Sequence, residues 1–390
     1  MRDFFVDLHI HIGRTASGKP VKITGAKRLT LSNIIEYARS IKGIDMIGII
    51  DCHVPEVIAE LEDMIAAGEA IELSEGGIDF HGLTLILGTE MEIYDDNCKG
   101  PIHVLAFMPQ LQKMKQFSKW LAAHVKNITL SSQRVYEQAK TIQHVVCELG
   151  GMFIPAHVFT PHKSLYGKGV ENSLREVLDH RKIDAIELGL SSDTAMADQI
   201  SELHHYSYIS NSDAHSLEKI AREYQTIRME HASFNELRLA LHEQEGRKVS
   251  ANFGLNPYLG KYYYTSCEKC STIIPNEDDM ICPTCEHNRF TKGVYNRLLE
   301  LKSSDGPLVP NRPPYIHQVP LEFIPKLGSK TLAKLRDHFK TDMAIIHDVP
   351  EEGLRHVVSD SIAETIIKAR RGELQFHYGG AGRYGKVKDT

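Results

Sequence analysis

The stretch VDLHIH, residues 6–11, places Asp7, His9 and His11 at every second position. Residues two apart on a β-strand face the same side, roughly 6.5–7 Å from one another. Because apolar residues alternate with them, we expect a buried strand with all three polar side chains on one face. Buried imidazoles and carboxylates need partners. Either hydrogen bonds within the core or a bound metal ion would supply these partners. This motif alone does not decide between the two alternatives.

Other apolar runs end in the same residue types. Asp51 and His53 close one run, and Glu90 and Glu92 close another. Further candidates lie at the boundaries of other runs: His103, His157, Asp213 and His215. One such coincidence is ordinary, but repetition at so many strand ends indicates a shared site for two or three divalent ions.

Residues 1 to about 250 alternate short apolar runs with amphipathic segments, which is typical of an α/β fold with a mostly parallel sheet. Seven or eight such units suit a barrel, and barrel active sites gather where the strands end. The expected strands lie within 4–11, 45–53, 83–94, 102–108, 151–157, 185–190 and 206–215. The expected helices lie within 31–42, 54–67, 133–149, 171–179 and 194–205.

The order of these motifs resembles the PHP (polymerase and histidinol phosphatase) domain family. The resemblance implies a distorted (β/α)7 barrel with a trinuclear metal site. Gly88-Thr89-Glu90 matches the family's bridging glutamate best, with Glu92 as the alternative. Many members have adjacent Asp-His where this chain has Asp51-Cys52-His53, so Asp51, His53 or both are candidates. The implied ligands are His9, His11, Asp51, His53, Glu90, His103, His157, Asp213 and His215, with His11, Glu90 and Asp213 expected to be catalytic.

The ligand types suit Zn, Mn, Fe or Mg. Two ions about 3.5–4 Å apart can hold a phosphate and stabilise both oxygens of an in-line displacement. The site therefore predicts phosphoester hydrolysis by a metal-activated hydroxide. The sequence contains neither GxSxG nor a GxxxxGK[ST] phosphate loop, which argues against a serine hydrolase or a P-loop NTPase.

Four clustered cysteines form two CxxC pairs separated by eleven residues: Cys267, Cys270, Cys282 and Cys285. Four thiolates at this spacing predict one structural zinc ion, with an iron site as the alternative. The preceding Tyr262, Tyr263 and Tyr264 either stack on bases or pack the ribbon against the barrel, and we favour packing.

Residues 322–339, EFIPKLGSKTLAKLRDHF, predict two helices joined by a tight turn at Leu327–Ser329. This resembles the helix-hairpin-helix motif of DNA-binding proteins, which implies phosphate contact without sequence preference. The alternative is a helical hairpin that only packs on the barrel. Residues 349–371 predict a second hairpin, and the Gly-rich tail predicts a loop. The DNA-contact candidates are Lys326, Gly328, Ser329 and Lys330.

We therefore expect a metal-dependent phosphoesterase domain (1–250), a zinc ribbon with linker (251–320) and a helical DNA-binding domain (321–390). This order resembles the endonuclease Q family. The resemblance implies a DNA repair endonuclease that cuts 5′ to uracil, hypoxanthine, xanthine and abasic sites, leaving 3′-hydroxyl and 5′-phosphate ends. The alternatives are a phosphatase acting on a small phosphomonoester and a non-catalytic binding module.

Reading a damaged base in a duplex requires its extrusion into a pocket. The candidate pocket loops are 14–28 and 159–169, in which Phe159 and Tyr166 are available for stacking. Damaged DNA is the expected partner, and a sliding clamp is a further candidate although no terminal clamp-binding peptide is evident. The chain has no apolar run of the roughly 18–20 residues that span a bilayer and no signal-peptide pattern, so we expect a cytoplasmic, nucleoid-associated protein.

Overall fold

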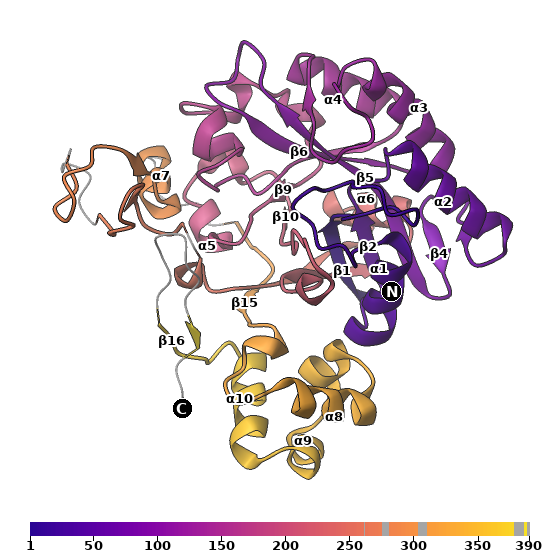
Figure 1. The fold of residues 1–390 in the computed structure, drawn as a ribbon, viewed down its shortest axis with the longest axis vertical. Helices are drawn as coiled ribbons and strands as arrows, with labels where there is room; N and C mark the ends of the chain where they lie inside the picture. The colour runs from indigo at the N-terminus through magenta and orange to yellow at the C-terminus, as the bar shows by residue number, and fades with distance from the viewer. Residues whose placement is uncertain (261, 275–280, 303–309, 378–385, 388–390) are drawn as a thin grey trace.

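Strand β1 (Arg2–Ile10) lies within a mixed sheet of eleven strands among the residues that the structure describes. This computed structural model describes residues 1–260, 262–274, 281–302, 310–377 and 386–387 (Figure 1). Each run expected as a strand contains one, which confirms the α/β fold class. The strands from these runs are β1, β2 (Met46–Ile49), β5 (Leu83–Ile93), β6 (Ile102–Met108), β8 (Met152–Pro155), β9 (Ile186–Glu187) and β10 (Tyr208–Ile209).

The expectation of a mostly parallel sheet is wrong. β1, β2 and β5 are parallel neighbours, but β6 runs antiparallel to both β5 and β8. The reason is the connection 94–101, which contains no helix and is too short for a parallel crossover. Antiparallel strands also extend the sheet beyond β1, namely β11 (Tyr224–Met229) and β12 (Lys248–Gly254), and β12 then pairs in parallel with β15 (Tyr315–His317).

The reversal of β6 explains the position of one candidate ligand. The other candidates lie toward or beyond the ends of their apolar runs, whereas His103 begins one. Because β6 is antiparallel, its first residues lie beside the last residues of β5, and His103 pairs with Glu92. The start of β6 therefore reaches the same edge of the sheet as the ends of β1, β2 and β5.

A register irregularity in β1 separates Asp7 from the two histidines. It lies between Asp7 and Ile10 in the ladder to β2. Leu8 packs in one hydrophobic core and Ile10 in another, although residues two apart in a regular strand share a face. The Asp7 carboxylate accepts backbone N–H groups from Ser212 (3.0 Å) and Ala221 (2.9 Å) instead of facing the histidines' partners.

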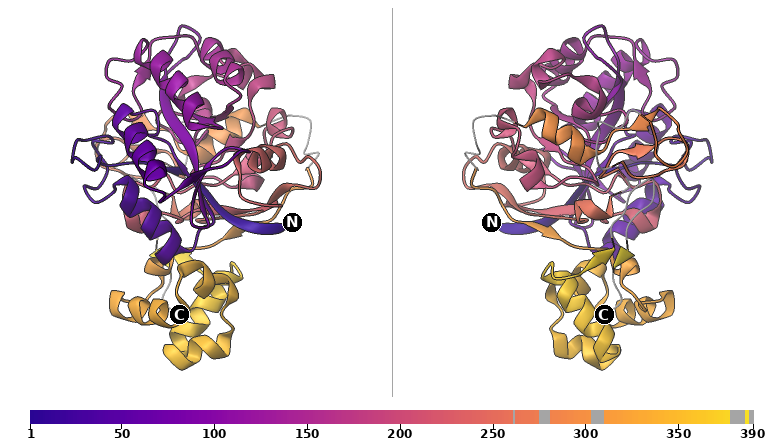
Figure 2. Two further views of the ribbon diagram at one scale, coloured as in Figure 1. Left: turned by 90° about the vertical axis from the view of Figure 1, so that its right-hand side faces the viewer. Right: turned by 90° about the vertical axis from the view of Figure 1, so that its left-hand side faces the viewer.

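Three of the five segments expected to be helical contain a helix, namely 31–42, 54–67 and 133–149, but the other two form only turns of three or four residues. Helices also form at Leu111–Ala122 and Phe234–Leu241, outside the expected segments, and all of them pack around the sheet (Figures 1 and 2). In 171–179, the side chains of Glu176 and Glu202 accept backbone N–H groups, so local bonds replace helical ones. No helix among the described residues is both long and apolar enough to cross a bilayer. The main helices are α1 (Leu31–Glu36), α2 (Pro55–Ala66), α3 (Leu111–Ala122), α4 (Ala139–Glu148) and α6 (Phe234–Leu241).

The C-terminal helices form a separate lobe below the barrel in all three views (Figures 1 and 2). The expected first helix of its first hairpin is only a 3-10 turn, Leu321–Phe323, because Pro320 and Pro325 bracket it. The expected second hairpin is present as α9 (Glu351–Val357) and α10 (Asp360–Arg370). The predicted boundary at residue 250 falls inside β12. The lobe contains α8 (Ser329–Phe339), α9 (Glu351–Val357) and α10 (Asp360–Arg370).

The Gly-rich tail is described only in part. Strands β16 (Phe376–His377) and β17 (Lys386–Val387) pair antiparallel within the segment expected to be a loop. All four glycines between these strands lie outside the described residues.

Buried ion pairs hold the lobe to the barrel. The Lys42 side chain is 3% exposed, and its Nζ lies 3.0 Å from Asp342 Oδ2 and 3.2 Å from Glu322 Oε1. Arg336 also pairs with Asp342, at 2.7 Å. Removing one partner of such a buried pair is costly because it strands the other charge. The lobe therefore has a fixed orientation relative to the barrel.

A histidine of the lobe also enters this interface and makes its stability depend on pH. The His347 ring lies 4.8 Å from that of Phe5, and its Nε2 lies 2.7 Å from the Tyr224 hydroxyl. Burial lowers the pKa of His347 to about 4, and Arg370 adds to this shift. In the unfolded chain a histidine takes up its proton near pH 6.5. The contribution of neutral His347 to the free energy of unfolding is therefore complete above that pH and is lost as the pH falls toward 4.

We expect His347 to contribute about 2 kcal/mol to the loss of unfolding free energy between pH 7 and pH 5. His347→Gln keeps a hydrogen-bonding side chain and should remove this part of the pH dependence. The measurement is urea denaturation at both pH values, with His338→Gln on exposed α8 as the control. Equal pH dependence in His347→Gln and the wild type would contradict the prediction.

Candidate metal centre

Three groups of candidate ligands overlap at the edge where β1, β5 and β8 end. Within each group the nitrogen and oxygen atoms lie within 4.8 Å of one another. His11 and Glu90 each belong to two groups. Glu90 has two carboxylate oxygens and can bridge neighbouring ions, whereas His11 offers only Nε2, because its Nδ1 faces Asp51. The groups are His9, His11 and Glu90; Glu90, His103 and His157; and His11, Asp213 and His215.

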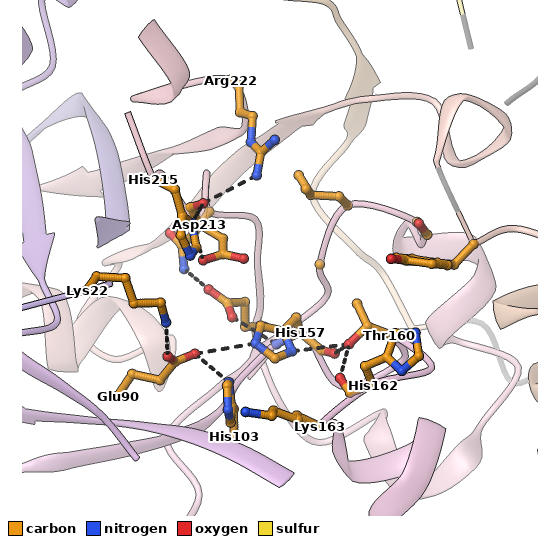
Figure 3. A pocket seen from close by; sticks show the side chains of 16 residues that line it. Lys22, Glu90, His103, His157, Thr160, His162, Lys163, Asp213, His215 and Arg222 are labelled. Carbon is orange, nitrogen blue, oxygen red and sulfur yellow. Dashed lines mark hydrogen bonds and ion pairs between the residues drawn. The ribbon is translucent and has the colours of Figure 1, made fainter. Parts of the chain in front are cut away.

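Glu90 contacts several of the side chains that line the site, and Figure 3 shows its carboxylate paired with Lys22, His103 and His157. Its Oε1 is 2.8 Å from His103 Nδ1, and its Oε2 is 3.6 Å from His11 Nε2 and 3.2 Å from Lys22 Nζ. Burial would raise the pKa of Glu90, but the charges of His103 and Lys22 outweigh it and hold that pKa well below its usual range. Glu92 joins none of the three groups and instead pairs with Lys163 at 2.8 Å.

Two of the ligands occupy strained backbone positions in loops. His157 has φ 32° after β8, and Asp213 has φ 45° after β10, a region that non-glycine residues rarely adopt. Gly189 allows the first of these, because a Cβ there would lie 2.8 Å from His157 Cβ. Such strain persists where the surrounding structure determines the position, as at ligand-binding sites.

Several buried histidine nitrogens at this centre lack hydrogen-bond partners among the described residues, as expected of metal ligands. The Nε2 atoms of His9, His11 and His103 are buried without a hydrogen-bond partner among the described residues. Burial would lower the pKa of His9, yet Glu187 and Asp213 raise it well above its usual value. The site therefore combines unpartnered imidazole nitrogens with excess negative charge. Divalent cations satisfy both, and mixed histidine and carboxylate sets suit Zn, Mn or Fe.

Glu187 is a functional residue that the sequence-based analysis missed. Its carboxylate lies 2.9 Å from His9 Nδ1 and accepts N–H bonds from Asn211 Nδ2 (2.7 Å) and the His157 backbone (2.8 Å). It thus fixes the ring of His9 and the loop of His157 together. The available signal was an acidic residue inside the apolar run 185–190, the same signal that identified Glu90.

Glu187→Gln is expected to weaken metal binding by about 10- to 100-fold, because outer partners of ligating histidines tune their basicity and orientation. Metal titration of the purified variant, followed by calorimetry, measures this effect. The exposed Glu230→Gln is the matched control. Wild-type affinity in Glu187→Gln would show that His9 needs no such support.

Asp51 supports His11 in the way that Glu187 supports His9. Asp51 Oδ2 lies 3.2 Å from His11 Nδ1 and accepts the Ile12 N–H at 2.8 Å. His53 Nε2 lies 3.4 Å from the Leu130 carbonyl oxygen. The structure places neither Asp51 nor His53 in a group of candidate ligands among the described residues, so their role as ligands stays a prediction.

The centre opens into a cavity of about 310 Å³. Lys22, Lys163 and Arg222 contribute positive charge to its wall (Figure 3). Lys22 comes from the predicted pocket loop 14–28 and Lys163 from the loop 159–169. The cavity therefore combines candidate metal ligands with cations, as a phosphate site requires.

The two aromatic residues expected to stack on a base lie in the core instead. Phe159 is 2% exposed and Tyr166 is fully buried, and their rings stack on each other at 5.5 Å. The Tyr166 hydroxyl donates to Glu202. In this arrangement neither ring is available to a base. The sequence did not reveal this, because aromatic residues in an apolar run occur both in cores and on binding surfaces. Tyr262 lines the cavity instead, with its ring 5.3 Å from that of His162.

The cysteine cluster forms a second, separate site. The Sγ atoms of Cys267 and Cys285 are 3.6 Å apart, and those of Cys270 and Cys282 are 3.5 Å apart. The cluster lies on a small hairpin of β13 (Ser266–Cys267) and β14 (Phe290–Thr291). Four thiolates at these distances fit a closed tetrahedral zinc site. Beside it, Tyr263 is buried and stacks on Tyr295, as the packing interpretation expects.

The hairpin turn of the lobe is exposed to solvent. All four DNA-contact candidates are exposed, and Gly328 precedes α8 without a side-chain cap. The first N–H groups of a helix left open in this way favour anions. Lys219 Nζ lies 4.8 Å from the Phe323 ring, so the segment before the turn lies beside the loop that carries Asp213 and His215. The four candidates are Lys326, Gly328, Ser329 and Lys330.

No family model matches the chain. The crystal structure of PfuEndoQ, a lesion-specific endonuclease from Pyrococcus furiosus, superimposes with a TM-score of 0.85 at 30% sequence identity, covering 99% of this chain and 95% of that one. The chain belongs to the endonuclease Q family. A second endonuclease Q structure, a complex with a 27-mer duplex carrying an abasic lesion at the active site, superimposes with a TM-score of 0.84 at 29% identity over 100% and 97% of the two chains.

A protein from Bacillus subtilis matches this chain from end to end. Uncharacterized protein YqxK (strain 168) is 55% identical over the full length of both chains. Uncharacterized protein MJ0043 from Methanocaldococcus jannaschii is 36% identical over 59% of this chain and 31% of its own length. Membership of the endonuclease Q family confirms the resemblance seen in the motif order.

Proposed function

We propose that the chain is a metal-dependent endonuclease that cuts duplex DNA on the 5′ side of a deaminated base or abasic site, leaving 3′-hydroxyl and 5′-phosphate ends. The observation that carries the proposal is the overlap of three ligand groups at the floor of a cavity lined by Lys22, Lys163 and Arg222. The related endonuclease Q structure with an abasic lesion at its active site supports damaged DNA as the substrate.

Ions bound here would polarise the scissile phosphate and activate water. The side chains around them hold the geometry. Glu187 and Asp51 each bind the Nδ1 atom of a histidine, so the Nε2 atoms of His9 and His11 point toward Glu90. Lys22 Nζ, held by Ser132 at 2.7 Å, brings a positive charge to the cavity and can neutralise a phosphate oxygen.

In this proposal the exposed hairpin turn binds the phosphate backbone of the duplex. A phosphomonoesterase would not need such a contact. Replacing both Lys326 and Lys330 by alanine is expected to weaken duplex binding equally for all sequences. Because each lysine that neutralises a phosphate releases counterions, the slope of log K against log salt should fall by about 2. Binding titrations at several salt concentrations measure it. The matched control is Arg228→Ala with Lys248→Ala on the exposed β11–β12 ladder, and an equal change in both double variants would contradict a specific role for the turn.

The decisive assay uses end-labelled duplexes with one deoxyuridine, one deoxyinosine, one abasic site or no lesion, in Mg²⁺ or Mn²⁺. A single cut immediately 5′ of the lesion, absent in Asp213→Ala, is the expected result. No cut on any lesion, together with metal-dependent release of phosphate from small monoesters, would overturn the proposal in favour of a phosphatase. A sliding clamp remains a candidate partner, and part of the C-terminal tail lies outside the described residues.

A further inference from the structure

A stack of exposed aromatic and cationic side chains lies next to the metal centre. The Arg134 guanidinium carbon lies 4.8 Å from the ring centroid of Tyr94 and 5.3 Å from that of Tyr136. Tyr94 is 40% exposed and Tyr136 50%, which places both among the few large apolar side chains open to solvent. Lys126 Nζ lies 5.7 Å from the outer tyrosine, Tyr136. These four residues are called the aromatic stack below.

The aromatic stack continues onto α3. The Tyr136 backbone N–H donates to the His124 carbonyl at 2.7 Å, and the His124 ring stacks on Trp120 at a centroid distance of 4.3 Å. Trp120 is partly exposed and is the chain's single tryptophan. One continuous surface therefore carries four aromatic rings and two cations.

The same loop holds the metal centre and the aromatic stack. Strand β7 (Arg134–Val135) pairs with the end of β5, with Arg134 opposite Glu92. Two residues earlier, the Ser132 hydroxyl contacts Glu90 and Lys22. Val135 is buried and fixes the loop between these two contacts. The aromatic stack is thus attached to the strand that carries Glu90.

The acidic residues beside the aromatic stack argue against a phosphate site. Asp95 accepts the backbone N–H groups of Asn97 and Ala139, and Glu137 accepts that of Gln138. These carboxylates stabilise the segment, but they would repel a phosphate backbone. Aromatic faces accept nucleobases instead, and an adjacent arginine strengthens that stacking.

We propose that the aromatic stack is a platform for unpaired bases of the DNA strand that flanks the cleaved phosphate. This inference rests on the proposed function for the identity of the strand. Extruding a lesion from a duplex unstacks its neighbours. A platform fixed to β5 would hold those neighbours at a set distance from Glu90.

Trp120 provides a readout that does not depend on catalysis. A single-stranded thymidine oligonucleotide, added in chelator, is expected to quench its fluorescence on binding to the full chain. Tyr94→Ala with Tyr136→Ala should weaken this binding at least about tenfold, whereas Tyr94→Phe with Tyr136→Phe keeps the rings and should stay within about twofold. Arg228→Ala, at the amino end of the barrel, controls for an exposed arginine.

On lesion-containing duplex, the double alanine variant should raise KM about tenfold and leave kcat nearly unchanged. Wild-type KM and oligonucleotide affinity in that variant would overturn the inference and assign Arg134 and the tyrosines a packing role only. Quenching by the oligonucleotide without lesion cleavage by the wild type would keep the platform and overturn the proposed function instead.

Discussion

Glu90→Gln is expected to lower DNA cleavage by about a thousandfold or more, a loss of about 4 kcal/mol of transition-state stabilisation. Glu90 belongs to two of the three ligand groups, so the change weakens two ion positions together. The amide keeps the shape of the side chain but lacks the charge that His103 and Lys22 stabilise. Single-turnover cleavage rates and the metal content of the variant, measured by elemental analysis, test this prediction.

Glu92→Gln is the matched control, two residues along the same strand. Glu92 pairs with Lys163 and lies 3.9 Å from His103 Nε2, but it joins none of the ligand groups among the described residues. Its variant should keep its bound metal and lose at most about tenfold in rate. Equal losses in both variants would contradict the assignment of Glu90 as the bridging residue.

Cys282→Ser should abolish zinc binding by the four-cysteine cluster, which we expect to hold one ion, and should unfold this segment. Among the described residues of the ribbon, its own core consists of Cys267, Ile274 and Cys282, with Cys285 and Phe290 packed against them, so little apolar area in this part holds it together. Zinc sites of this type supply about 10–16 kcal/mol of folding free energy in isolated peptides. We expect the variant to lose about one zinc ion per chain and to be cut by protease within residues 266–291.

Cys147→Ser provides the matched control, because Cys147 is exposed and lies outside the cluster. It should keep the zinc ion and its resistance to protease. Loss of the ribbon should also reduce cleavage of DNA, since the cavity wall includes Tyr262, which precedes the first cysteine pair. A Cys282→Ser protein with full zinc content would contradict the four-cysteine site.

The candidate ligands could be predicted because strand ends concentrate polar residues whose burial needs an explanation. His9, His11, Glu90, His103, His157, Asp213 and His215 all come together in the structure. The reversal of β6 was also within reach, since His103 begins its run and the connection before it lacks a helix. The expectation of a mostly parallel sheet assumed that all the runs are strands of the same direction. It therefore ignored the position of His103 at the start of its run.

Other parts of the site depend on contacts that periodicity does not encode. The exclusion of Asp7 from the centre follows from a register irregularity inside β1. The contacts of Asp51 Oδ2 with His11 Nδ1 and the Ile12 N–H were also not predictable from the spacing of residue types. The burial of Phe159 and Tyr166 likewise depends on their mutual stacking and on Glu202. A pattern of residue types cannot separate a ligand from the residue that supports it.

The hydrogen bond from the Ser212 N–H to Asp7 indicates when during folding the metal centre is assembled. It joins residues 205 positions apart, and the Ala221 N–H reaches the same carboxylate across 214 positions. Contacts of such sequence separation form late, because closing a long loop costs entropy before it returns stability. A chain still on the ribosome therefore displays His9 and His11 long before Asp213 exists. The enzyme is expected to acquire its ions, and with them the capacity to cut DNA, only when the barrel has closed.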